Sequence, residues 1–250
     1  MPRRKVCIAQ AKTKTRKKQK PVEEYKGLVT FILISDLPGY RMKSYGPAPL
    51  LNIKKRKLID YQIKAITESF INPEIVLCVG FESDKITKYI RQSYPDLNIR
   101  IVENQLFNQT NSCESLRLCL NNTNNHKVFV IDGSVLFKKN TLNLHDINEP
   151  SICVEKENKD CFDIGVNIDE CESAAHFSFG ANRNWSEILY LSDKYSIDSL
   201  RKIISMENFK RKFVFEALNE LIKTHPKIKT IYNKYSIYKI NNIKTYHDLR

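Results

Sequence analysis

Continuous apolar runs alternate with amphipathic segments along the first half of the chain. The apolar runs have strand length and lie at residues 28–34, 74–81, 98–104 and 127–133. The amphipathic segments have helical spacing and lie at residues 57–70, 83–94 and 111–122, the second with Ser83 as its expected N-cap. Unbroken apolar strands are typical of parallel sheets that are covered on both faces. The order therefore predicts an α/β fold with a mostly parallel central sheet and flanking helices.

The second half of the chain has a less regular pattern. Strands are expected at residues 151–156, 162–169, 176–180, 227–233 and 237–241, and helices at residues 185–191, 197–204 and 212–225. Trp185, the only tryptophan, is expected to anchor the core. Because no linker rich in Pro, Gly or Ser separates the halves, we expect one α/β domain over residues 25–250 after an arm at residues 1–24.

Composition places the chain among cytoplasmic globular proteins. Hydrophobic residues make up 42% of the 250 residues, which is enough for a core, and no apolar run is long enough to span a membrane. The seven cysteines include no CxxC pair, so reduced thiols are expected and a zinc site is not.

Most of the positive charge lies at the N-terminus. Of the formal net charge of +13, +9 lies in residues 1–20, which contain no acidic residue, and this leaves +4 for the rest of the chain. The basic residues of the arm are Arg3, Arg4, Lys5, Lys12, Lys14, Arg16, Lys17, Lys18 and Lys20. Such an arm is suited to contact nucleic acid or another anionic surface. A solubilising terminus and a localisation signal are the alternatives.

Polar or glycine-containing segments follow each of the four predicted parallel strands. They are residues 35–42, 80–81, 104–115 and 132–134. Ligands of open α/β sheets bind outside the carboxyl ends of the strands, so these four segments together predict a ligand site. For Asp132-Gly133 a simple turn is the alternative, because this dipeptide favours turns.

Six short motifs occur in an order that resembles a known family. They are SDLPGYRM at 35–42, PAPLLNI at 47–53, VLCVGF at 76–81, NQTNSCESL at 108–116, VFVIDGSVLF at 128–137 and IYKINN at 237–242. This order resembles the nucleotidyltransferases with a GT-A-like Rossmann fold, which include sugar-1-phosphate nucleotidylyltransferases and phosphocholine cytidylyltransferases. The resemblance covers residues 28–137 well and the later residues only weakly.

The resemblance implies a set of nucleotide-binding candidates. They are Ser35, Asp36, Gly39, Arg41, Lys43, Gly80, Asn108, Asn111 and Ser115. The residues also allow structural roles: Arg41 could pair with Asp36 across its loop, and Asn111 or Ser112 could cap the helix that follows.

Three departures from the family pattern decide the functional hypothesis. Ala48 stands where the family has a lysine, and Ser134 and Asn241 stand where it has two aspartates that bind Mg²⁺. Nucleotidyl transfer depends on such charges, so we expect a catalytically degenerate protein with a binding or structural role and no cofactor. Its expected partners are a weak nucleotide ligand, a protein or a second copy of the chain, and nucleic acid at the arm.

The alternative is an active Mg²⁺-dependent nucleotidyltransferase that makes an NDP-linked, CDP-like sugar or small alcohol phosphate. In that case Asp132 and Asp248 would replace the metal ligands, and Lys43 would replace the missing lysine. The two hypotheses differ in whether Asp36, Asp132 or Asp248 converge on one point beside Arg41 or Lys43.

Overall fold

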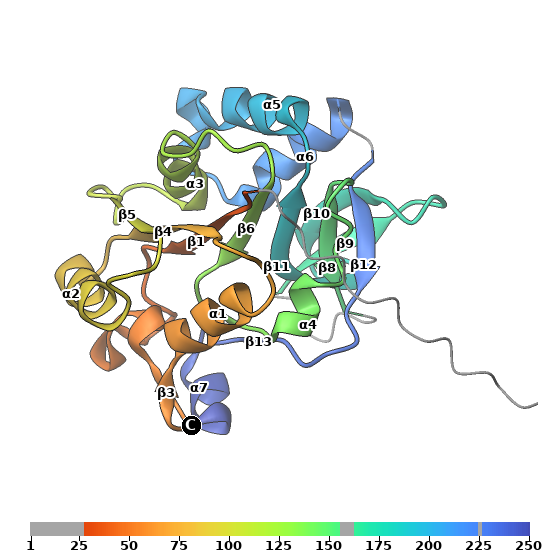
Figure 1. The fold of residues 1–250 in the computed structure, drawn as a ribbon. Helices are drawn as coiled ribbons and strands as arrows, with labels where there is room; N and C mark the ends of the chain where they lie inside the picture. The colour runs from red at the N-terminus through yellow and green to blue at the C-terminus, as the bar shows by residue number, and fades with distance from the viewer. Residues whose placement is uncertain (1–27, 156–162, 225–226) are drawn as a thin grey trace, which may run out of the picture.

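A computed structural model describes residues 28–155, 163–224 and 227–250 (Figure 1). The basic residues of the expected arm lie outside these ranges. Seven strands follow the order β10-β9-β11-β6-β1-β4-β5, while β8 pairs with β11 and β12 pairs with β8. The strands of this sheet are β1 Thr30–Ser35, β4 Glu74–Val79, β5 Ile99–Glu103, β6 Val128–Asp132, β8 Ser151–Val154, β9 Ile164–Ile168, β10 Ala174–Phe179, β11 Arg183–Leu191 and β12 Lys229–Tyr232.

The four predicted apolar runs form the parallel part of the sheet. β1 lies between β4 and β6, and β5 pairs with β4, all in parallel. All residues of β1 and β4 are buried, because helices cover both faces of the sheet. The predicted α/β fold with a mostly parallel central sheet is therefore confirmed.

Helices cover the sheet on two sides, as Figure 1 shows. On one side lie α3 Ser112–Leu120, α5 Lys194–Ile204 and α6 Val214–Thr224. On the other lie α1 Leu58–Thr67, α2 Ser83–Ser93 and α4 Lys139–Leu142. The expected cap of α2 is wrong: Glu82 is the N-cap residue, with φ 52°, and the Ser83 hydroxyl donates instead to Glu103 at 2.7 Å.

The segment 185–191 is a strand, not the predicted helix. It forms most of β11, which pairs antiparallel with β6, β8 and β9. Along β11, Ile188 and Tyr190 pack on one side of the sheet, while Leu189 and Leu191 pack on the other. Because both sides are buried, the segment has no polar face, and its apolar run fits a helix as well as a strand. Trp185 is buried against Phe177, as expected of a core anchor.

A small additional layer lies outside the sheet and its two helical layers, near the C-terminus. It contains the hairpin β2 Asn52–Ile53 and β3 Arg56–Lys57, the 3-10 helices Lys43–Tyr45 and Ala48–Leu50, and α7 Ile243–Leu249. These elements pack around Met42, Leu51, Ile240 and Tyr246. β13 Tyr238–Lys239 pairs with β7 Val135–Leu136, which ties this layer to the sheet.

The described cysteines are free thiols, as expected from the absence of CxxC pairs. Cys78, Cys113, Cys119 and Cys153 are buried free thiols, and Cys171 is an exposed one. Of the helices in the described part of the chain, none has the length and apolar character that a membrane crossing requires.

Candidate functional site

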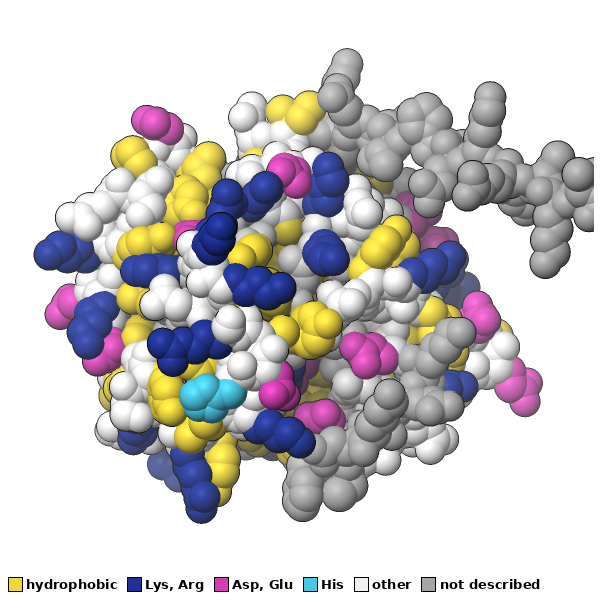
Figure 2. All heavy atoms as spheres, turned by 90° about the horizontal axis from the view of Figure 1, so that it is seen from below, with side chains coloured by type: hydrophobic (Ala, Val, Ile, Leu, Met, Phe, Trp, Pro, Cys, Tyr) yellow, Lys and Arg dark blue, Asp and Glu magenta, His cyan; other side chains and the backbone are white. Residues whose placement is uncertain are grey.

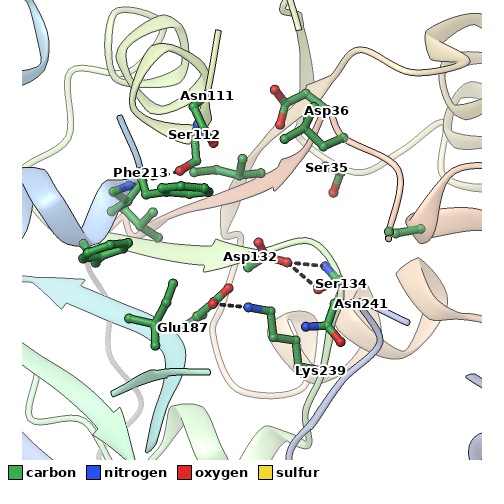
Figure 3. Close-up of a pocket in the computed structure, with 18 of the residues that line it drawn as sticks. Ser35, Asp36, Asn111, Ser112, Asp132, Ser134, Glu187, Phe213, Lys239 and Asn241 are labelled. Carbon is green, nitrogen blue, oxygen red and sulfur yellow. Dashed lines mark hydrogen bonds and ion pairs between the residues drawn. The ribbon is translucent and has the colours of Figure 1, made fainter. Parts of the chain in front are cut away.

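A cavity of about 280 Å³ opens at the carboxyl ends of β1 and β6 (Figure 3). The loop after β1, residues 35–40, forms one wall of it, and Asn111 and Ser112 at the start of α3 form another. Trp185, Phe213 and Phe215 supply an apolar side. The cavity therefore lies where the strand-end segments of the sequence predict a ligand site.

The three departures from the family pattern meet in this cavity. Ala48, Ser134 and Asn241 all line it, although they come from three separate segments of the chain. The backbone fixes the last two: the Ile240 amide donates to the Ser134 carbonyl at 3.0 Å, and the Tyr40 amide donates to the Asn241 carbonyl at 2.8 Å. Positions matched by motif alone thus belong to one site in space.

Asp132, at the end of β6, forms a tight turn with Ser134. One carboxylate oxygen of Asp132 accepts from the Ser134 amide at 2.8 Å and from the Ser134 hydroxyl at 2.6 Å. The turn alternative for Asp132-Gly133 is thus part of the structure. Asp132 also lines the cavity, so its carboxylate serves the turn and contributes charge to the site.

Glu187 and Lys239 form a buried ion pair that the sequence analysis missed. Glu187 lies on β11 with its backbone in the left-handed region, at φ 53°, and Lys239 lies on β13. Their side chains are joined by an ion pair at the edge of the cavity (Figure 3). The only signal in the sequence was a glutamate within the apolar segment 185–191, where an unpaired charge would be costly.

The ammonium of Lys239 is paired with Glu187 and is also influenced by the charge of Asp132. Glu187 comes one residue before Ile188, which pairs with Ile131 of β6, and its carboxyl group interacts with that of Asp132. Burial, and then the charge of Asp132, raise the pKa of Glu187 to about 7. Burial alone would lower the pKa of Lys239, but the carboxylates of Glu187 and Asp132 raise it, so the lysine stays charged.

Asp36 is held away from the arginine that was its possible partner. Its carboxylate accepts from the Ser115 hydroxyl at 2.6 Å and from the Asn104 amide at 3.2 Å. Burial raises the pKa of Asp36, although these two hydrogen bonds lower it. The guanidinium of Arg41 lies 5.1 Å from the centre of the Tyr40 ring. Pairing of Arg41 with Asp36 is therefore not what the structure shows.

The predicted nucleotide-binding residues separate into two groups. Ser35, Asp36, Gly39 and Asn111 line the cavity, and the Asn111 side chain also caps α3 by accepting from the Ser112 amide at 2.8 Å. The others lie outside the lining: Arg41, Lys43, Gly80, Asn108 and Ser115. Ser115 acts on the site only through Asp36, and Gly80 packs against Phe107.

The residues present do not fit a magnesium ion. Ser134 and Asn241 are neutral, and Asp132 and Glu187 already face the ammonium of Lys239. Asp248 lies exposed on α7, outside the cavity lining. Within residues 28–155, 163–224 and 227–250, no three His, Cys, Asp or Glu side chains are grouped so that they could hold a metal ion. Mg²⁺ prefers charged oxygen ligands, which this arrangement does not leave free.

Many solved structures resemble this fold, whereas comparison of the sequence with family models and curated proteins finds no match. No protein-family model matches the chain, and no curated protein matches its sequence. The CTP:phosphocholine cytidylyltransferase of Streptococcus pneumoniae superposes with a TM-score of 0.74 at 19% identity, over 88% of this chain and 97% of that one.

Two further structures show the same likeness. The inositol-1-phosphate CTP transferase of T. maritima has a TM-score of 0.72 at 16% identity, over 87% of this chain and 93% of that one. A UDP-glucose pyrophosphorylase solved with UDP-glucose has a TM-score of 0.73 at 13% identity, over 89% and 97%. The chain thus has the GT-A-like Rossmann fold of the nucleotidyltransferases, as its motifs predict.

Proposed function

We propose that this protein is a ligand-binding member of the nucleotidyltransferase fold that does not carry out metal-dependent nucleotidyl transfer. The observation that carries the proposal is the ammonium of Lys239, which faces Asp132 and Glu187 in the cavity where Ala48, Ser134 and Asn241 also meet. A cation of the protein itself therefore offsets part of the negative charge of the site.

The chemistry of the transfer explains why these residues matter. The protein contributes little covalent chemistry to the displacement at a phosphorus atom, so catalysis is mostly positioning and stabilisation of charge. A metal and a lysine supply that stabilisation in the family that the motifs resemble. In this cavity Ala48 supplies no charge, and Lys239 is engaged by two carboxylates.

The charges of the cavity indicate how a nucleotide-like ligand would bind. Asp36, Asp132 and Glu187 line it together with one lysine, so a triphosphate would meet net negative charge. Trp185, Phe213 and Phe215 offer an apolar side that suits a base, and Asn111 and Ser112 offer polar groups that suit a sugar. The solved structures of this fold named above act on CTP or bind UDP-glucose, which supports a nucleoside as the recognised part.

A thermal-shift series tests the proposal. Wild type and the variant Ala48→Lys/Ser134→Asp/Asn241→Asp are heated with each nucleoside and each NTP, with and without Mg²⁺. We expect Mg²⁺ to leave the wild-type response unchanged and to raise the melting temperature of the variant with an NTP. A ligand at 100 times its dissociation constant adds about 2.7 kcal/mol, which is easily measured. The control Ala48→Met/Ser134→Asn adds similar bulk without charge and should behave as wild type.

An active Mg²⁺-dependent transferase is the second candidate, and one observation favours it. The carboxyl groups of Asp132 and Glu187 interact with each other, so they could bind one metal if Lys239 moved away. Release of pyrophosphate from CTP or another NTP, in the presence of Mg²⁺ and phosphorylated sugars or alcohols, measures this activity directly. We expect no release above the level of a Glu187→Gln variant.

The basic arm is a separate part of the proposal. We infer that residues 1–20 contact nucleic acid, because the arm concentrates +9 in twenty residues without an acid. A protein partner or a second copy of the chain is the other proposed contact. Removing residues 1–24 should weaken nucleic-acid binding and reduce its dependence on salt.

A further inference from the structure

A second basic region lies on the folded domain itself, separate from the arm. Between Leu37 and Ile59 there are six basic residues and no acidic one. Three of the six, Lys54, Lys55 and Arg56, are exposed on the β2–β3 hairpin. The arm was evident from composition, but this region depends on how the hairpin is placed.

The hairpin turn holds lysines where turn chemistry favours other residues. Ile53 pairs with Arg56, so Lys54 and Lys55 form a two-residue turn. Lys54 adopts a left-handed backbone, with φ 53°, which Asn or Gly adopts more readily. The stability of the turn therefore does not explain why lysines occupy it. Their exposed positive charge is the property that remains to explain their presence.

Packing in the small additional layer places further basic side chains on the same face. The hairpin residue Ile53 and Tyr246 of α7 belong to one apolar cluster. Lys244 is exposed on α7, and Arg250 is exposed directly after it. Tyr45 links the neighbouring segment to α7, with its ring centre 5.5 Å from that of Tyr246. Figure 2 views this side of the molecule, and dark blue Lys and Arg side chains gather across its middle.

Within the described chain, the basic residues of this face have no ion pairs of the kind that several helical lysines have. On the helices, Lys85 pairs with Glu82 and Lys223 with Glu220, each within one turn. In the described ranges, no carboxylate lies within ion-pair distance of Lys43, Lys54, Lys55, Arg56, Lys244 or Arg250. Like charges left unneutralised on one face repel each other, and they are stabilised by a polyanion that releases its counterions.

Exposed tyrosines distinguish among the possible polyanions. Tyr40 is 70% exposed and Tyr45 is 40% exposed, and Arg41 lies over the Tyr40 ring. Aromatic rings among basic groups are typical of surfaces on which the bases of a single strand stack. A membrane-binding face would instead present Trp, Phe or Leu side chains beside its lysines.

We propose that this face, which comprises Tyr40, Arg41, Lys43, the β2–β3 hairpin and the basic residues of α7, binds single-stranded nucleic acid. In this proposal, Lys54, Lys55 and Arg56 contact the phosphates, and the Tyr40 ring stacks on a base. Tyr40 also lines the cavity, so the face is continuous with the cavity mouth.

Fluorescence anisotropy with a labelled 20-nucleotide oligothymidylate tests the proposal on the full chain. The test variant is Lys54→Gln/Lys55→Gln/Arg56→Gln, and the matched control is Lys194→Gln/Lys202→Gln/Arg211→Gln, which removes the same charge from exposed positions around α5. We expect the test variant to bind at least about 10-fold more weakly near 0.1 M salt. The slope of log affinity against log salt concentration should become less steep by about two. Each single-strand phosphate contact contributes about 0.7 to this slope, and the variant removes three such contacts. The control should change affinity less than about 2-fold.

Two outcomes would overturn the proposal. One is an equal loss of affinity in the test and control variants, which would show that only net charge and the arm bind the strand. The other is a Tyr40→Leu variant with unchanged affinity for the oligonucleotide, together with wild-type binding to vesicles rich in phosphatidylserine that the test variant lacks. That result would assign the face to a membrane surface. A loss of about 5-fold or more in Tyr40→Leu supports stacking.

Discussion

At the level of single residues, we propose that Lys239 determines what the cavity can bind. Its ammonium takes the place beside Asp132 and Glu187 that a divalent cation would need. Replacing Lys239 by Met leaves two facing carboxylates without a counter-charge, so the variant should bind Mn²⁺ with a dissociation constant on the order of 1 mM, whereas wild type should not. Electron paramagnetic resonance of free Mn²⁺ measures this directly.

A control separates the loss of charge from the loss of packing in this experiment. Lys239→Arg keeps a cation in the site and should leave Mn²⁺ unbound. If Lys239→Met folds and binds no more Mn²⁺ than Lys239→Arg does, the lysine does not substitute for a metal. Should Lys239→Met not fold, Lys239→Gln retains a hydrogen-bond donor for Glu187 and answers the same question.

Glu187 should give the protein a pH-dependent stability. Its pKa is about 4.5 in an unstructured chain and about 7 in the folded protein, so between these values the folded state binds a proton that the unfolded state has lost. The stabilisation is complete below about pH 4.5 and is lost as pH rises through 7, by up to roughly 3 kcal/mol. Urea unfolding from pH 5 to 8 should show this loss in wild type but not in Glu187→Gln. Parallel pH profiles for the two proteins would refute the assignment.

At the level of the elements, most strands and helices could be predicted and the charged pair could not. The strands β1, β4 and β6 are nearly all apolar, and their runs correctly predict buried strands. The same property misled at β11, because a segment buried on both sides loses the alternation that identifies a strand. Glu187 and Lys239 lie 52 residues apart and meet only through the placement of β11 and β13, which no local spacing encodes.

The junction of β1 and β6 leaves no room for a side chain at Gly133. A Cβ there would lie 1.7 Å from the Ser35 hydroxyl oxygen and 2.8 Å from the Ile34 carbonyl oxygen. Gly133→Ala should therefore lower the free energy of unfolding by about 1–3 kcal/mol. Ser35→Gly removes the closer contact and should restore part of the loss in the double variant. Additive effects of the two substitutions in urea titrations would contradict this local packing.

At the level of the whole molecule, the cavity and the basic face differ in charge. The cavity is lined by three carboxylates and one lysine, while the hairpin and α7 face carries basic residues without an ion pair in the described ranges. The two surfaces meet at Tyr40, which lines the cavity and also belongs to the basic face.

The expected division into an arm and a single domain leads to the last prediction. Val29 is buried and β1 begins at Thr30, so removing residues 1–24 takes away no described core residue. The truncated protein should unfold in urea with the midpoint of the full chain. Trp185 fluorescence reports the side of the sheet that carries α3, α5 and α6, whereas circular dichroism reports the helices of both sides. Coincident transitions by the two probes are expected of one domain. Separate transitions would divide residues 25–250, and a lower midpoint would show that the arm packs on the domain.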